Sequence, residues 1–245
     1  ISENAALTSL YLSSLTDVGG YLTIYDNDAL ELLSIDSLTD VSEDMYISEN
    51  DVLTLLTAYD LASVGGYLDI SYNASLNSFS IDSGFSTGGN LSIYENASLT
   101  SFSLDGLTEI GEHLYIYDND ALASLSMDSV SNIGGYLWFT ANNALTSVAL
   151  DSLTYVGSTV NIQSNAALTS FSLASLTEVG GDLYIYNHSS LSSLSFDSLA
   201  TINGYFWVTS NNSLSYLALD SLTSTTSFFA LYENASYCQS QAEAW

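Results

Sequence analysis

The chain has 245 residues and carries no lysine or arginine beside its 28 Asp and Glu, so its formal charge is −28 at pH 7. A surface of this sign repels nucleic acid and anionic membranes, which excludes both as partners. No carboxylate can pair with a basic side chain, so water, backbone N–H groups and dissolved cations must balance the charge. We therefore expect a secreted or cell-surface protein in a saline setting, without direct membrane insertion.

A unit of 23 residues repeats along the whole chain without insertion or deletion. A fixed period of this length is typical of a solenoid, in which each copy buries its apolar face only against its neighbours. We expect a ten-turn repeat solenoid over residues 1–230, then a partial repeat and C-terminal cap over 231–245, the whole being a piece of a longer surface protein. The ten full copies begin at Ile1, Ile24, Ile47, Ile70, Ile93, Ile116, Phe139, Ile162, Ile185 and Val208.

In each copy the predicted elements follow one another as turn, strand, corner and strand. Glycine pairs such as Gly19 and Gly20 precede the first strand, where we expect a turn with positive φ. Apolar residues then alternate with period two, as at Leu22 and Ile24, and this spacing favours strands over a helical repeat. The sequence therefore predicts an all-β fold, a single β-solenoid. At about 4.8 Å per turn, the rod would be about 50 Å long.

Position 4 of the repeat is an asparagine in ten of eleven copies, and His188 is the exception. An amide at a corner can bond to the backbone, and stacked amides can form a ladder between turns. We predict a structural ladder, in which His188 fills the same corner. Its members are Asn4, Asn27, Asn50, Asn73, Asn96, Asn119, Asn142, Asn165, Asn211 and Asn234.

The string Leu-x-Ile-x-x-Asn-x-x-Leu, as in residues 22–30, resembles the signature of leucine-rich repeats. Together with the preceding Val-Gly-Gly-x-Leu, this string is more closely similar to the receptor L-domain, the β-helical ligand-binding module of insulin- and epidermal-growth-factor-type receptors. The resemblance is strongest to the regular L-domain-like repeats of microbial surface proteins. Asn234, Cys238 and Trp245 resemble the closing turn of that family. The resemblance covers essentially the whole chain. It implies binding or scaffolding outside the cell, with ligand on the equivalent sheet face, rather than catalysis.

Aspartate recurs at position 13, and four of these residues fall in consecutive turns. Like charges about 5 Å apart repel by roughly 0.9 kcal/mol even in water, so something should offset them. One interpretation is capping of the corner, with each carboxylate accepting a backbone N–H. The other is calcium, which prefers clusters of oxygen ligands. The four candidate ligands are Asp82, Asp105, Asp128 and Asp151.

Tyrosine and tryptophan occupy many of the outward positions of the first strand and the position just before it. Cross-strand ring pairs stabilise a sheet by themselves, but an exposed face this rich in rings is also typical of a contact surface. It could take a glycan, a protein or another copy of the chain. The predicted ligand-binding rings are Tyr21, Tyr25, Tyr46, Tyr67, Tyr94, Tyr115, Tyr117, Tyr136, Trp138, Tyr184, Tyr186, Tyr205 and Trp207.

Catalytic residues are scarce, because the chain has one cysteine, Cys238, and two histidines in different repeat columns, His113 and His188. Asn90 and Asn187 are the glycosylation sequons expected to be exposed. We expect no cofactor apart from possible calcium. The sequence predicts a non-enzymatic structural or adhesive surface protein that binds a glycan or protein through its aromatic face. The alternative is a protomer that stacks end to end, or through that face, into an extracellular filament or surface layer.

Overall fold

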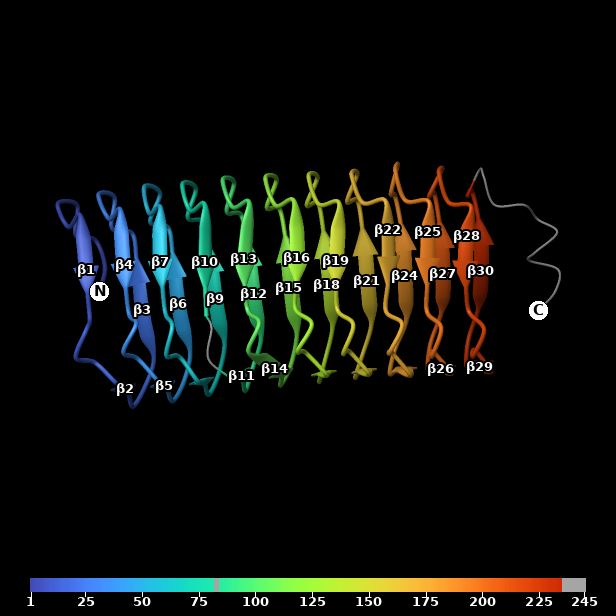
Figure 1. Cartoon of the computed structure of the whole chain (residues 1–245), viewed down its shortest axis with the longest axis horizontal. Coiled ribbons are helices and arrows are strands. Elements are labelled where there is room, and N and C mark those ends of the chain that lie inside the picture. The colour runs from blue at the N-terminus through green and yellow to red at the C-terminus, as the bar shows by residue number, and fades with distance from the viewer. Residues whose placement is uncertain (82–83, 235–245) are drawn as a thin grey trace.

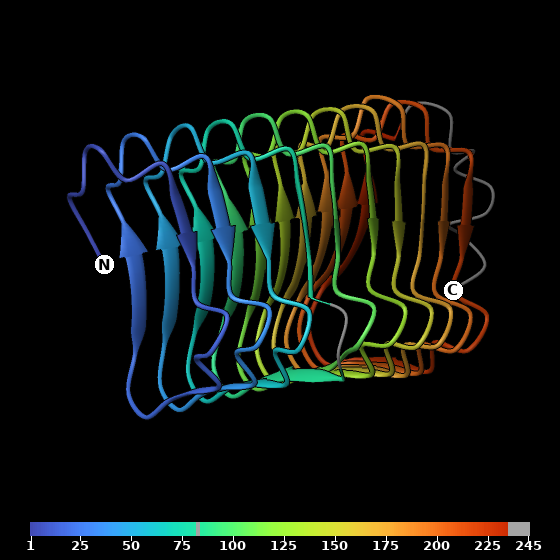
Figure 2. The same cartoon turned by 60° about the vertical axis from the view of Figure 1, so that its left-hand side comes forward.

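The computed structural model describes residues 1–81 and 84–234, and every element among them is a β-strand. The chain winds into a parallel β-solenoid of about ten turns that stack along the long axis of the molecule (Figure 1). The strands of each turn contribute to separate parallel sheets, which we call the first, second and third face (Figure 2). The first and last described turns therefore lie at opposite ends of a rod.

The first face has the longest and most regular strands. It consists of β3 (Leu22–Tyr25), β6 (Met45–Ser48), β9 (Leu68–Ser71), β12 (Leu91–Tyr94), β15 (Leu114–Tyr117), β18 (Leu137–Thr140), β21 (Val160–Gln163), β24 (Leu183–Tyr186), β27 (Phe206–Thr209) and β30 (Phe229–Tyr232).

The second face is divided into a seven-stranded and a three-stranded sheet. The larger sheet consists of β1 (Ser9–Tyr11), β4 (Leu32–Ser34), β7 (Leu55–Thr57), β10 (Ser78–Ser80), β13 (Ser101–Ser103), β16 (Ser124–Ser126) and β19 (Ser147–Ala149). The smaller sheet consists of β22 (Ser170–Ser172), β25 (Ser193–Ser195) and β28 (Tyr216–Ala218).

The third face, which the prediction of two strands per turn did not include, consists mostly of two-residue strands. They are β2 (Asp17–Val18), β5 (Asp40–Val41), β8 (Ser63–Val64), β11 (Phe85–Thr87), β14 (Leu107–Ile110), β17 (Asn132–Ile133), β20 (Tyr155–Val156), β23 (Glu178–Val179), β26 (Thr201–Ile202) and β29 (Ser224–Thr225).

Strand pairing follows the 23-residue period, so that Ile24 pairs with Ile47 in the next turn. The described exception is the pairing of β11 with β14, where the register shifts after Phe85. Gly84 stands there in place of the usual leucine, and Phe85, one residue later, fills the core instead, with 1% of its surface exposed. The core therefore stays filled although the backbone steps by one residue.

The inward residues of all three faces form one continuous apolar core. Leu53, Leu76 and Leu99 occupy the same position in successive turns, and each is wholly buried. Burying one such side chain contributes about 1.5–3 kcal/mol, and most of the covering surface belongs to neighbouring turns. Stability is thus a property of the stack rather than of any single turn.

The prediction of positive φ at the glycine pairs is wrong, since none of the described glycines has positive φ. Their role is steric. A Cβ built on Gly134 would lie 2.1 Å from the carbonyl oxygen of Gly111 in the preceding turn, and Gly157 and Gly180 meet their predecessors at 2.1 and 2.2 Å. Glycine therefore lets the backbones of successive turns approach closely at this corner.

The left-handed conformation occurs instead at the residue just before each ladder position. Eleven non-glycine residues have φ between 53° and 63° there. They are Glu3, Asp26, Glu49, Tyr72, Glu95, Asp118, Ala141, Ser164, Asn187, Ser210 and Glu233. The ladder holds this bend, which a non-glycine residue rarely adopts unaided.

The asparagines form a ladder of buried amides along one edge of the first face. Asn96 is representative: its Nδ2 donates to the carbonyl oxygens of Ile70 and Tyr94 at 2.9 and 3.0 Å, and its Oδ1 accepts from the Asn73 N–H at 3.1 Å. Asn96 thus binds its own turn and the preceding turn, and its Nδ2 also donates to Asn119 Oδ1 in the next turn at 3.3 Å. The ladder fixes the corner that follows every strand of the first face.

His188 keeps the ladder intact with a ring in place of the amide. Its Nε2 lies 3.1 Å from the carbonyl oxygen of Ile162, and its Nδ1 lies 3.3 Å from the Asn165 backbone nitrogen. Nδ1 also lies 3.2 Å from the Asn165 carbonyl oxygen, so it faces both an N–H and a carbonyl, whereas Nε2 faces the Ile162 carbonyl. In the neutral ring the proton therefore belongs on Nε2, and Nδ1 accepts from the Asn165 N–H. Burial lowers the pKa of His188, which favours this neutral ring.

Candidate binding face

The predicted rings lie along the first face because its strands alternate inward and outward residues. In β15 the inward Leu114 and Ile116 are buried, whereas the outward Tyr115 and Tyr117 are half-buried. The remaining predicted rings on these strands are Tyr25, Tyr46, Tyr94, Trp138, Tyr184, Tyr186 and Trp207, and Tyr232 on β30 is a further outward ring. Tyr21, Tyr67, Tyr136 and Tyr205 stand just before the strands and are more exposed, at 37–68%.

The rings contact one another from turn to turn. Tyr94 stacks on Tyr117 with ring centroids 4.6 Å apart, and Tyr115 lies 6.3 Å from Trp138. Tyr72, which the sequence reasoning missed, meets Tyr94 edge-on at 5.3 Å. Tyr72 has φ 53° and follows its strand, so the alternation of strand residues gave no signal for it.

The aromatic surface is interrupted, because some turns carry polar residues at the outward positions. Asn161 and Gln163 occupy β21 and separate the rings of β15 and β18 from those of β24, β27 and β30. Asp69 similarly stands between Tyr46 and the central rings. The face therefore offers separate ring clusters rather than one continuous aromatic sheet.

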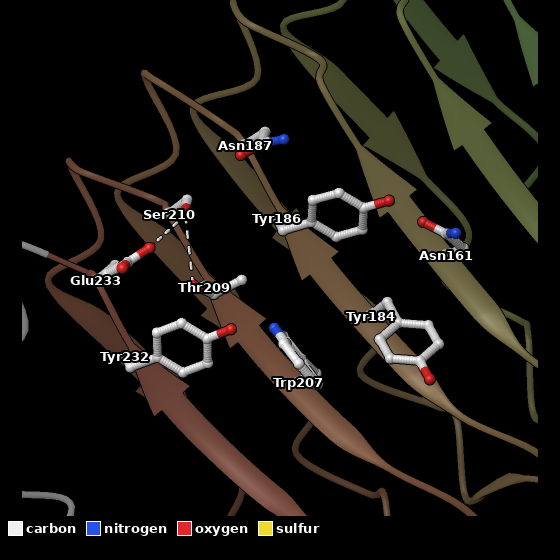
Figure 3. A pocket seen from close by; sticks show the side chains of 9 residues that line it. All are labelled: Asn161, Tyr184, Tyr186, Asn187, Trp207, Thr209, Ser210, Tyr232 and Glu233. Atoms are coloured by element: carbon white, nitrogen blue, oxygen red, sulfur yellow. Dashed lines mark hydrogen bonds between the residues drawn. The ribbon is translucent and has the colours of Figure 1, made fainter.

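A hollow with a volume of about 380 Å³ lies in the C-terminal cluster of this face. Its lining residues are Asn161, Tyr184, Tyr186, Asn187, Trp207, Thr209, Ser210, Tyr232 and Glu233 (Figure 3). The Ser210 hydroxyl donates to Glu233 at 3.2 Å and lies 3.3 Å from the Thr209 hydroxyl. Asn161 Oδ1 is buried and has no hydrogen-bond partner among the described residues. Rings and hydrogen-bonding groups thus meet in one hollow.

A second hollow of about 290 Å³ lies in the central cluster. It is lined by Tyr115, Tyr117, Trp138 and Thr140. The Trp138 indole N–H donates to the Thr140 hydroxyl at 2.7 Å, which fixes the indole against the strand. The sequence reasoning named these rings but missed the hydroxyl and amide groups between them, although those groups occupy the same outward columns.

Three phenol groups of the face have raised pKa values and are therefore neutral at physiological pH. The hydroxyls of Tyr46 and Tyr184 donate to the carboxylates of Asp44 and Asp182 at 3.0 and 2.9 Å. Burial, reinforced by these carboxylates, raises the pKa of both tyrosines to about 12. Burial likewise raises the pKa of Tyr117 well above its ordinary value.

The aspartate column lies away from the rings, and Asp105, Asp128 and Asp151 are exposed. Asp128 Oδ1 accepts from the Asp151 N–H at 3.4 Å, and its Oδ2 accepts from the Ser126 hydroxyl at 3.2 Å. This pair has the geometry of corner capping. Within residues 1–81 and 84–234, no three His, Cys, Asp or Glu side chains are arranged to hold a metal ion. Asp82 lies outside the described residues, and calcium stays a prediction.

The two candidate glycosylation sites differ in surroundings. Asn90 is half-buried, and its Oδ1 accepts from the His113 N–H at 3.1 Å. Asn187 is exposed and lines the larger hollow. Cys238 and most of the expected cap, residues 235–245, lie outside the described residues.

The repeat, the strand order and the register define a leucine-rich β-solenoid. No protein-family model matches the sequence, and no curated protein matches it. Among solved structures, the chain is similar to a leucine-rich repeat protein from Bacteroides ovatus, at 14% sequence identity and a TM-score of 0.46, over 94% of this chain and 76% of that one. No helix capable of crossing a membrane occurs in the described part of the chain.

Proposed function

We propose that the chain is a non-enzymatic surface protein of the extracellular space, with a structural or adhesive role, and that it binds a glycan or protein through the first face. The observation that carries this proposal is the hollow in which Tyr184, Tyr186 and Trp207 stand beside amide and hydroxyl groups. Apolar residues exposed on a monomer are normally scattered singly, whereas grouped rings with polar neighbours are typical of contact surfaces.

The sheet holds these rings in place before any partner arrives. Parallel pairing of β24 with β27 sets Tyr184 opposite Trp207, and the ladder fixes the corner beyond each strand. A rigid surface loses little conformational entropy on binding. An aromatic side chain at the centre of such a surface typically contributes about 2 kcal/mol or more to binding.

The experiment compares the full chain with the double variant Tyr184→Ala/Trp207→Ala on arrays of glycans and of extracellular protein domains. Tyr216→Ala is the matched control, because Tyr216 is 57% exposed but lies on the second face. We expect the double variant to lose the signals that the wild type gives, and the control to keep them. Equal signals from the double variant and the wild type would refute binding through the first face.

The same rings fit a second candidate function, the contact of one copy with another in an extracellular filament or layer. A charge of −28 on every copy opposes such assembly unless salt screens it. Sedimentation at micromolar concentration, in low and in physiological salt, separates the two. Monomers in both conditions refute assembly, whereas salt-induced fibres that the double variant fails to form would make assembly the function of this face.

A further inference from the structure

Two hollows on the first face are built from the same four side chains. The central subsite consists of Tyr115, Tyr117, Trp138 and Thr140. The C-terminal subsite contains Tyr184, Tyr186, Trp207 and Thr209. Each member of the second set follows its counterpart by 69 residues, which is three turns of 23.

The Tyr–Trp ring pairs of the two subsites share their geometry, whereas the threonines differ: Thr140 accepts from the Trp138 indole and Thr209 contacts the Ser210 hydroxyl. The tyrosine and tryptophan rings on adjacent strands have centroids 6.3 Å apart in both, with interplanar angles of 53° and 63°. Between β18 and β27 the outward Trp and Thr are the same, whereas the inward pair Leu137 and Phe139 becomes Phe206 and Val208. The core accepts either inward pair, so core packing does not account for the match of the outward pair.

The subsites lie in line along the rod. Both use the same two outward columns, and they are three strand spacings apart, or about 14 Å. Asn161 and Gln163 on β21 lie between them. Asn161, whose buried Oδ1 has no hydrogen-bond partner among the described residues, also lines the C-terminal hollow.

The chemistry of the lining is nearly neutral. No charged residue lines the central hollow, and Glu233, which accepts from Ser210, is the charged residue in the larger one. A chain with 28 carboxylates and no basic residue disfavours any anionic polymer. The central hollow therefore suits the apolar face of an uncharged ligand, and the C-terminal hollow adds hydrogen-bonding groups beside its rings.

We propose that the two subsites bind one neutral polysaccharide laid along the rod axis, so that each subsite stacks on the same kind of sugar ring. This inference rests on the proposed function and commits it to a glycan. A sugar ring presents C–H groups to the Tyr and Trp faces of both subsites, and hydroxyls to the amide and hydroxyl groups that line the C-terminal one. Two equivalent subsites on a rigid scaffold raise the effective concentration of a polymer that has engaged one of them.

The chain also contains a turn pair that lacks the site. Residues 69 positions before the central subsite are Tyr46, Ser48, Asp69 and Ser71, so a carboxylate stands where the tryptophan would be. Burial raises the pKa of Asp69, which accepts a hydrogen bond from the Ser71 hydroxyl. Two subsites, not three, are therefore expected on the described chain.

The test measures binding of the full chain to soluble neutral glucans, mannans and xylans, and to short oligosaccharides cut from them, by calorimetry and tryptophan fluorescence. Polygalacturonate is the anionic control. The variants are Trp138→Ala, Trp207→Ala and their double, with Trp138→Tyr and Trp207→Tyr as conservative partners that retain a ring, and Tyr216→Ala as a surface control. Each single tryptophan variant leaves the other subsite its own fluorescent reporter.

We expect each single alanine variant to lose about 100-fold or more in affinity for a neutral polymer, because avidity disappears with one subsite. Oligosaccharide stoichiometry should fall from two to one, the double variant should not bind, and the tyrosine variants should recover most of the affinity. If one single variant abolishes binding and the other has no effect, the two-subsite inference is wrong while the proposed function stands. If the double variant binds as the wild type does, both fail. If no neutral polymer binds the wild type, the glycan inference is overturned and protein ligands remain for the proposed function.

Discussion

Replacing Asn119 with alanine measures what one rung of the ladder contributes. Its Nδ2 donates to the carbonyl oxygens of Ile93 and Tyr117 at 2.9 and 3.1 Å, and its Oδ1 accepts from the Asn96 N–H at 3.2 Å. The site is wholly buried, so water cannot replace these bonds. An orphaned N–H costs about 1–3 kcal/mol and each further lost bond about 0.5–1.5, so the free energy of unfolding should fall by about 2–6 kcal/mol.

Urea unfolding followed by circular dichroism gives the change in midpoint, and its slope shows whether the stack still unfolds as one unit. Asn119→His is the matched control, since the chain already uses a histidine in this column at His188, and it should retain most of the stability. Asn143→Ala removes an exposed amide that donates to Asp120, and should change stability by less than about 0.5 kcal/mol. Equal midpoints for Asn119→Ala and Asn143→Ala would refute the ladder as a source of stability.

Two further predictions concern the other corner and the histidine rung. Gly134→Ala places a Cβ within 2.1 Å of the Gly111 carbonyl oxygen, so the free energy of unfolding should fall by about 1–3 kcal/mol. Gly19→Ala is the control, because a Cβ there meets nothing within 4 Å, and it should leave stability unchanged or raise it. Equal urea midpoints for the two variants would contradict the steric argument. Because burial lowers the pKa of His188, the unfolded chain takes up a proton below about pH 6.5 that the folded chain refuses, and stability falls as pH falls. His188→Asn should remove this loss, so the melting temperature of the variant should exceed that of the wild type by more at pH 5 than at pH 7. The same difference at both pH values would contradict the prediction.

The repeat alone predicts most of the fold. Leucine, isoleucine and asparagine at fixed positions indicate stacked strands, an apolar interior and a buried amide column, because each property depends only on the period. The conformation of the glycines could not be read in this way. Glycine meets two different needs, positive φ and close approach, and the sequence of Gly134 and Gly135 does not distinguish them. The contact that decides belongs to the neighbouring turn, at Gly111.

The outward position of the rings was likewise predictable from alternation, but their grouping was not. Counting tyrosines and tryptophans by column obscures the turns where Asp69, Asn161 and Gln163 take their place. Hollows form between rings on adjacent strands, so they depend on which rings follow one another along the stack. A comparison of turns three apart, rather than of all turns together, would have revealed from the sequence that Trp138 and Trp207 occupy equivalent positions.

Nearly every described strand pairs with residues 23 positions away, so distances along the rod axis change in steps of one whole turn. Deleting residues 150–172, one full period that includes β21, would remove one turn and join equivalent positions of the turns on either side. The distance between Trp138 and Trp207 would shorten by about 4.8 Å, and inserting a turn would lengthen it equally. Gain or loss of whole repeats can thus change the distance between the two subsites in fixed steps, while the contacts between neighbouring turns stay the same.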